Sequence, residues 1–164
     1  MPYIMKKRVD MSGAAFAITL AIAVMLVCMV FVGYPRLETL GVALFVSVVV
    51  LLMLMALFYA PMSLSLDDKE LCVCRSFWVK RIPLSEIREV RAVSKDLPLS
   101  RVCGSGGFMG YWGWFRSPCI GKCFAYYGDK SQRFLLMLKD GRNYILGCRD
   151  ANELAVAVKE RVDE

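Results

Sequence analysis

Two long uncharged stretches dominate the N-terminal part of the chain. Neither 11–34 nor 39–66 contains a charged residue, and only residues 35–38, which begin with a proline, separate them. Each stretch supplies the roughly 20 apolar residues that a helix needs to cross a bilayer core, and proline breaks helices. The pattern predicts a transmembrane helical hairpin over 11–60, with spans at about 12–34 and 39–60 and a turn at 35–38.

Basic residues flank this predicted hairpin on one side. Lys6, Lys7 and Arg8 precede the first span and many more follow the second, whereas the turn holds a single arginine. The positive-inside rule then places both termini in the cytoplasm, with 1–10 as a basic cytoplasmic N-terminus. A cleaved signal peptide is excluded because the first stretch is too long and a second follows at once. The prediction is a multi-pass protein of the inner (cytoplasmic) membrane.

Composition agrees with this interpretation. Hydrophobic residues make up 57% of the 164, and the net charge is +6, with a mean hydropathy of +0.49. The seven cysteines are expected to stay reduced in a cytoplasmic domain and to act as small, half-buried residues.

From Met62 onward, short segments of alternating polarity replace the long apolar runs. Asp140-Gly141 between two apolar segments is a strong hairpin signal. Asp67-Asp68-Lys69 and Gly128-Asp129-Lys130 are further turns. Strands are expected at 63–66, 71–78, 82–93 (bent or bulged), 123–127, 134–138 and 143–146.

A helix is expected to close the chain. Leu154, Val158 and Val162 recur every four residues on one face. Asp150 as N-cap and Glu153 three residues later resemble a capping box. Short strands followed by one amphipathic helix predict an α+β fold, a small β-barrel or sandwich closed by a C-terminal α-helix, behind the transmembrane hairpin.

The Gly-aromatic segment GSGGFMGYWGWF (104–115), with the strand 121–127 after it and the closing helix from Ala151, resembles bacterial pleckstrin-homology (PH) domains. The likeness covers about 62–162 and is to the membrane-anchored type with two N-terminal transmembrane helices, so 62–164 is expected to be a cytoplasmic PH-like domain. The resemblance implies a binding module and says little about its ligand. In eukaryotic PH domains, the loop between the first two strands holds phosphoinositides, but 67–69 is acidic here, so that site is not carried over. An OB-like barrel is the alternative fold.

The stretch 101–123 around this segment is the predicted interaction loop. Tryptophan and tyrosine favour membrane interfaces, and basic residues favour anionic lipid. Strand alternation would send Trp112 and Trp114 to one face and Tyr111 to the other, so some rings are expected inside and some outside. The predicted loop residues are Phe108, Tyr111, Trp112, Trp114 and Phe115, and the predicted basic surface is Arg101, Arg116, Lys122, Arg88 and Arg91.

Other chemistries fit this stretch less well. The glycines resemble a phosphate-binding loop, but no Gly-Lys-Ser/Thr and no helix opening follow them. Only Cys119 and Cys123 have zinc-knuckle spacing, and the chain has no histidine. No RNA-binding motif is present, and no nucleophile–base pair appears at a recognisable spacing. Cys103 beside Arg101 is the one candidate reactive thiol. We therefore expect no metal, cofactor or nucleic acid, and no catalysis.

The predicted function is that of a non-enzymatic, membrane-anchored PH-like domain. It would bind a protein partner or anionic lipid headgroups at the cytoplasmic membrane surface. The alternative is a structural subunit of a larger membrane complex, with the Gly-aromatic loop as an obligate interface. The sequence leaves the ligand, the pathway and the oligomeric state open.

Overall fold

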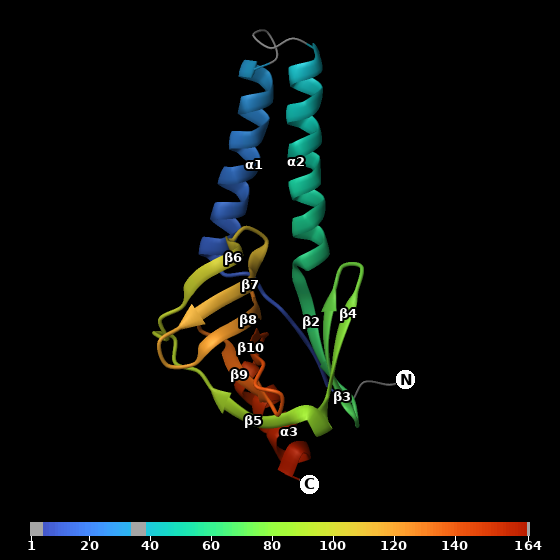
Figure 1. The fold of residues 1–164 in the computed structure, drawn as a ribbon, viewed down its shortest axis with the longest axis vertical. Helices are drawn as coiled ribbons and strands as arrows, with labels where there is room; N and C mark the ends of the chain where they lie inside the picture. The colour runs from blue at the N-terminus through green and yellow to red at the C-terminus, as the bar shows by residue number, and fades with distance from the viewer. Residues whose placement is uncertain (1–4, 34–38, 164) are drawn as a thin grey trace.

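The computed structural model describes residues 5–33 and 39–163 and places two upright helices on a domain of two sheets (Figure 1). The helices are α1 (Gly13–Gly33), α2 (Thr39–Tyr59) and α3 (Ala151–Asp163). The strands are β1 (Met5–Arg8), β2 (Pro61–Leu66), β3 (Glu70–Arg75), β4 (Val79–Pro83), β5 (Ile87–Ala92), β6 (Ser100–Gly107), β7 (Gly110–Ser117), β8 (Gly121–Tyr127), β9 (Arg133–Leu138) and β10 (Asn143–Gly147).

The strands form two open sheets. One has the order β1-β2-β3-β4, and the other has the order β5-β9-β10-β8-β7-β6, with β8 and β10 as its parallel pair. The 3₁₀ turn Leu84–Glu86 leads the chain out of the first sheet at β4 and into the second at β5. Among the described residues, strand pairing therefore stops at both ends of each sheet, so the predicted closed barrel, PH-like or OB-like, is wrong.

Two hydrophobic clusters lie on opposite faces of the six-stranded sheet. The first joins this sheet to the four-stranded sheet and to α3, and includes Phe134, Leu146 and Leu154. The second lies on the other face around Tyr111, Phe115 and Tyr127. The start of α1 and the segment 93–99 cover the second cluster. One face is thus closed by regular elements and the other largely by a connecting loop.

The hairpin predicted from Asp140-Gly141 is confirmed as β9–β10. Phe134 pairs with Leu146 and Leu136 with Tyr144, while Gly141 in the turn has φ +84°. An L side chain is strained in that conformation and glycine is not. The predicted turn chemistry therefore accounts for the register of this hairpin.

The predicted helix at the C-terminus is also confirmed, but its start differs in detail. Leu154 and Val158 are fully buried against the sheets. The carboxylates of Asp150 and Glu153, expected to form a capping box, instead accept hydrogen bonds from Lys7 Nζ at 3.2 and 2.6 Å. The N-terminal strand β1 thereby fastens the start of α3 to the four-stranded sheet.

The helices α1 and α2 are inserted between two neighbouring strands. The chain runs from β1 through α1 and α2 into β2, and β1 pairs with β2 in antiparallel register. Ser12 Oγ accepts a hydrogen bond from Ala15 N and caps α1. One turn on, Thr19 Oγ1 accepts a hydrogen bond from Met109 N at 2.9 Å. The first turns of α1 are therefore docked on the β6–β7 hairpin.

Among residues 5–33 and 39–163, no helix is both long enough and apolar enough to reach across a membrane. By this criterion the predicted spans at 12–34 and 39–60 are wrong, and so are the membrane-anchored type, the multi-pass inner-membrane location and the cytoplasmic placement of both termini. Part of each helix packs on the domain instead, since Ala15 is buried and Tyr59 stacks on Trp112. The predicted turn 35–38 lies outside the described residues.

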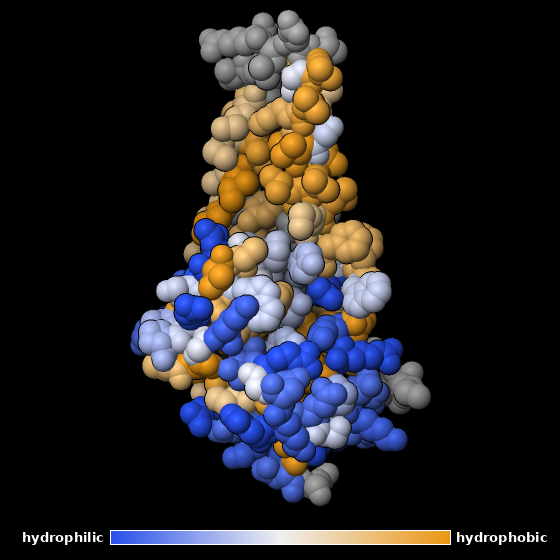
Figure 2. Space-filling view, in the orientation of Figure 1, coloured by the Kyte–Doolittle hydropathy of each residue, from blue (hydrophilic) through white to orange (hydrophobic). Residues whose placement is uncertain are grey.

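The outer surface of the helix pair is nonetheless apolar. Figure 2 shows hydrophobic residues over α1 and α2 and mostly hydrophilic residues over the strands and α3. Exposed side chains include Phe16, Leu20 and Phe31 on α1, and Leu40 and Leu44 on α2. The surface of the chain is thus sharply divided by polarity.

Candidate functional site

The Gly-aromatic stretch forms the β6–β7 hairpin. Gly104 and Gly113 face each other in its register, with φ +125° and +122°. A Cβ on Gly113 would lie against the carbonyl oxygen of Cys103, and one on Gly104 against that of Trp112. These two glycines therefore serve the close pairing of two strands.

Strand alternation divides the aromatic rings as predicted. Tyr111 and Phe115 are buried in the second cluster, whereas Trp112 packs against the first and stacks on Tyr59 with ring centroids 5.3 Å apart. Trp114 is 38% exposed, with Lys122 Nζ 4.4 Å from its ring centroid. Phe108 near the hairpin turn is half-buried. Of the five rings, Trp114 therefore presents the most open face.

The five predicted basic residues lie on four strands of the six-stranded sheet. Arg116 of β7 pairs in register with Ser100 of β6 and Lys122 of β8, whereas Arg101 pairs with Phe115 and so points to the opposite face. Arg88 and Arg91 lie on β5, the opposite edge strand. Arg91 binds Glu89 at 2.7 Å on its own strand. The structure therefore brings together Arg116 and Lys122, places Arg101 on the other face of the same hairpin, and leaves Arg88 and Arg91 at the far edge of the sheet.

A pocket of about 440 Å³ opens beside this hairpin, over the second cluster. Four cationic side chains and one carboxylate line it, together with two tyrosines, and we call it the basic pocket. Arg101 comes from β6, Arg133 from β9, Lys95 from the loop after β5 and Lys130 from the loop after β8. Its full lining is Lys95, Asp96, Leu97, Leu99, Arg101, Gly106, Tyr111, Phe115, Tyr127, Lys130 and Arg133.

Arg133 is the fixed cation of the basic pocket. It is only 2% exposed, and its Nη2 donates hydrogen bonds to the carbonyl oxygens of Ser94 and Lys95 at 3.1 and 3.0 Å. Its guanidinium lies 5.1 Å from the Tyr127 ring centroid. Its Nε is buried and has no hydrogen-bond partner among the described residues. An unsatisfied buried donor costs free energy.

Two ionisable groups next to the cations of the basic pocket have shifted pKa values. Burial raises the pKa of Tyr127, against the opposing effect of the nearby Arg133 cation. The backbone N–H of Ser131 is the main cause that lowers the pKa of Asp129. Asp129 therefore stays ionised while its Oδ1 accepts two hydrogen bonds from Ser131. Lys130 Nζ lies 5.3 Å from the Tyr111 ring centroid.

Sequence reasoning missed most of the lining of this pocket, including three of its four cations. Lys95, Tyr127, Lys130 and Arg133 come from segments that carry no motif. The turn residues Gly128-Asp129-Lys130 indicated a loop, and nothing in the sequence showed that this loop meets 93–99. The signal that did point here was the joint presence of Arg101, Tyr111 and Phe115 in one stretch.

Burial makes several thiols poor nucleophiles. It raises the pKa of Cys123 to about 11 and is the main cause that raises that of Cys148 to about 12. Cys103, the candidate reactive thiol, is exposed on β6. In the part of the chain that the structure describes, no three His, Cys, Asp or Glu residues are placed to hold a metal ion.

Comparison with known proteins identifies the family. The family model of the bacterial PH domain matches residues 62–162, the range over which the sequence resembles such domains. No curated protein and no solved structure matches the chain. PH domains are in general non-catalytic binding modules. Because the family model spans more than half of the 164 residues, the chain belongs to the bacterial PH domain family.

Proposed function

We propose that the chain is a non-enzymatic binding module whose basic pocket holds the anionic headgroup of a lipid. The observation that carries this proposal is the convergence of Lys95, Arg101, Lys130 and Arg133 on one pocket that has a single lining carboxylate, Asp96. Guanidinium groups bind phosphate oxygens through charge-assisted hydrogen bonds. Tyr111 and Tyr127 supply an amphipathic wall beside them.

The face of the hairpin opposite the basic pocket holds a second group of side chains suited to a lipid surface. Trp114 and Lys122 present an indole and an ammonium group together, and Arg116 lies beside them in register. Indole rings and basic residues favour the headgroup region of an anionic surface. In this proposal the binding domain comprises 62–164, completed by β1. Arg88 and Arg91 take no part.

A titration of the full chain with glycerol 1-phosphate, followed by NMR, tests the pocket. The double variant Arg101→Gln/Lys130→Gln should weaken binding about tenfold or more, because two charge-assisted contacts are lost. The matched control Arg116→Gln/Lys122→Gln removes two exposed cations outside the pocket lining and should leave the affinity nearly unchanged. Equal losses in both variants would show diffuse attraction to positive charge and would contradict a defined pocket.

A vesicle experiment tests the lipid source of the anion. The full chain should bind phosphatidylglycerol vesicles more tightly than phosphatidylcholine vesicles. That difference should shrink with added salt and in Arg101→Gln/Lys130→Gln. A chain that binds glycerol 1-phosphate through the pocket but shows no preference for anionic vesicles would assign the pocket to a free phosphate ligand.

A protein partner is the second candidate, and the edge strand β6 favours it. Arg101, Val102 and Cys103 are exposed on this edge of the six-stranded sheet. An open edge can accept an added strand from another chain. As a subunit of a larger complex, the chain would use this hairpin as its interface. Thiol cross-linking through Cys103 in cells, with Cys103→Ser as control, would trap such a partner.

A further inference from the structure

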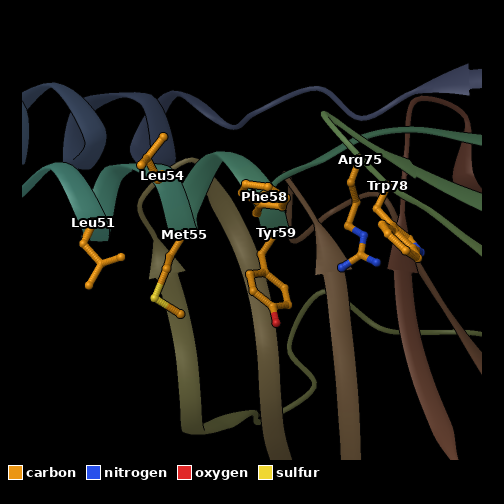
Figure 3. Close-up of a pocket in the computed structure, with 7 residues that line it drawn as sticks. All are labelled: Leu51, Leu54, Met55, Phe58, Tyr59, Arg75 and Trp78. Atoms are coloured by element: carbon orange, nitrogen blue, oxygen red, sulfur yellow. The ribbon is translucent and has the colours of Figure 1, made fainter.

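A second pocket lies where α2 meets the β3–β4 hairpin, and it shares no lining residue with the basic pocket. Its volume is also about 440 Å³, within the range typical of small-molecule sites. We call it the α2 groove. Leu51, Leu54, Met55, Phe58, Tyr59, Arg75 and Trp78 line it (Figure 3).

The α2 groove is apolar along its length and charged at one end. Figure 3 shows Leu51, Met55 and Tyr59 projecting to the same side of α2, as expected for residues four apart on a helix. The Arg75 guanidinium lies at the Tyr59 end of this row, between Tyr59 and Trp78 in that view. Arg75 is the one charged residue of the lining. The groove thus combines an apolar track with a single terminal cation.

The half-buried Arg75 has no anionic partner among the residues that the structure describes. Its Nε is buried without a hydrogen-bond partner there. Its guanidinium instead lies 5.6 Å from the Tyr59 ring centroid and 5.7 Å from that of Tyr126. Charges removed from water are normally paired.

A second unsatisfied donor lies close by. Trp112 Nε1 is also buried without a hydrogen-bond partner among the described residues, and its ring stacks on Tyr59. The side chains of both orphaned donors, Arg75 on one strand and Trp112 on another, therefore lie against the same tyrosine ring. Buried donors without acceptors are rare in folded proteins, and here both belong to side chains packed on Tyr59, which lines the charged end of the groove.

We propose that the α2 groove binds a long-chain carboxylate of the fatty-acid class, with the carboxylate on Arg75 and the chain along Leu51 and Met55. A guanidinium fits a carboxylate in a two-pronged arrangement. The single lining cation, Arg75, matches the single negative charge of a carboxylate. The exposed apolar side chains of the groove favour contact with a hydrocarbon chain. This inference does not depend on the proposed function, because the two pockets have no residue in common.

Calorimetric titration of the full chain with octanoate, decanoate and dodecanoate, each below its micelle concentration, tests the ligand class. Affinity should rise with chain length, by up to about fourfold per methylene at full burial. Decanol has the same chain as decanoate without the charge, so it should bind about tenfold more weakly or worse. Equal affinity for decanol and decanoate, or no dependence on chain length, would overturn the proposal.

Two matched pairs of variants locate the ligand. Arg75→Gln should weaken decanoate binding about tenfold, whereas Arg81→Gln removes an exposed cation of the neighbouring strand β4 and should have little effect. Leu51→Asn should weaken binding as well. Leu52→Asn, at a position that is equally exposed at 57% but does not line the groove, should not.

The leucine pair also covers the case in which Arg75→Gln does not fold, since either exposed substitution spares the packed core. Equal losses in Leu51→Asn and Leu52→Asn would show unspecific adsorption to the apolar helices and would overturn the proposal. The Arg101→Gln/Lys130→Gln variant should bind decanoate like the unmodified chain. Loss of decanoate binding in that variant would place the carboxylate in the basic pocket instead of the α2 groove.

Discussion

The two faces of the six-stranded sheet are built from the same strands and differ in what covers them. In β9, Phe134 and Leu136 point to the first cluster, while Leu135 belongs to the second and Arg133 to the basic pocket on that side. The first face is covered by α3 and the other sheet, and the second by the loop 93–99 and the start of α1. On the second face the covering loop supplies the carbonyl groups that accept hydrogen bonds from Arg133, and the pocket beside it has four lining cations.

The largest expected difference between the two faces is in unfolding free energy, when one phenylalanine on each face is replaced by alanine. Phe134→Ala should cost about 3–5 kcal/mol of unfolding free energy, because Phe134 is fully buried in the first cluster. Phe115→Ala should cost less, because Phe115 lines the basic pocket and the space left opens onto it. Chemical denaturation measures both values, and glycerol 1-phosphate affinity should fall only in Phe115→Ala. A larger cost for Phe115→Ala would show that the second face carries more of the stability.

The next test uses pH and one thiol from each face, Cys148 in the first cluster and Cys123 in the second. Burial raises the pKa from 9.0 to about 12 for Cys148 and to about 11 for Cys123. A raised thiol pKa stabilises the fold fully below pH 9.0, and this stability is lost as the pH rises toward the folded-state pKa. The loss at high pH corresponds to about 4 kcal/mol for Cys148 and about 3 kcal/mol for Cys123.

Denaturation under reducing conditions across that range should show stability falling with pH. Cys148→Ala should flatten the dependence more than Cys123→Ala. The comparison uses slopes against pH, so the packing cost of each alanine cancels. If Cys123→Ala flattens the pH dependence as much as Cys148→Ala or more, the face covered by the loop excludes water at least as effectively as the face covered by α3.

A smaller loss of stability is expected when Gly113 of the β6–β7 hairpin is replaced. Gly113→Ala should cost about 1–3 kcal/mol, because Gly113 has φ +122° and its new Cβ would meet the Cys103 carbonyl. Gly141→Ala is the matched control, since φ is +84° but nothing lies within 4 Å of the new Cβ. It should cost about 1 kcal/mol. Only Gly113→Ala should also weaken glycerol 1-phosphate binding, because Tyr111 and Phe115 flank it on β7.

Local sequence rules predicted the elements whose cause is local. The strands β8, β9 and β10 follow from short apolar segments bounded by turn residues, the β9–β10 register from Asp140-Gly141, and α3 from its four-residue periodicity. The strand β1 was missed because its sequence, Met-Lys-Lys-Arg, has no apolar alternation. It becomes a strand through pairing with β2 and the contact of Lys7 with Asp150 and Glu153. That contact joins residues more than a hundred positions apart, beyond the reach of any local pattern.

The candidate site was predictable in its residue types and not in its geometry. The sequence pointed to aromatic and basic residues around 101–123, and Arg101, Tyr111 and Phe115 do line the basic pocket. Lys95 and Arg133 reach it only because β5 and β9 pair and bring their neighbouring segments together. The open sheets were missed for a similar reason, because strand lengths and turns do not determine where strand pairing ends.

The antiparallel pairing of β1 with β2 has a mechanical consequence for the helix pair between them. The strand that leads into α1 and the strand that leads out of α2 are held together by backbone hydrogen bonds. Both ends of the α1–α2 helix pair are therefore anchored in the same sheet. A tilt or rotation of the helix pair must either break hydrogen bonds between β1 and β2 or move the whole domain with it. The hydrogen bond between Thr19 and Met109 also connects α1 to the β6–β7 hairpin. A force that displaces the helices would therefore also displace the β6–β7 hairpin, which forms one wall of the basic pocket.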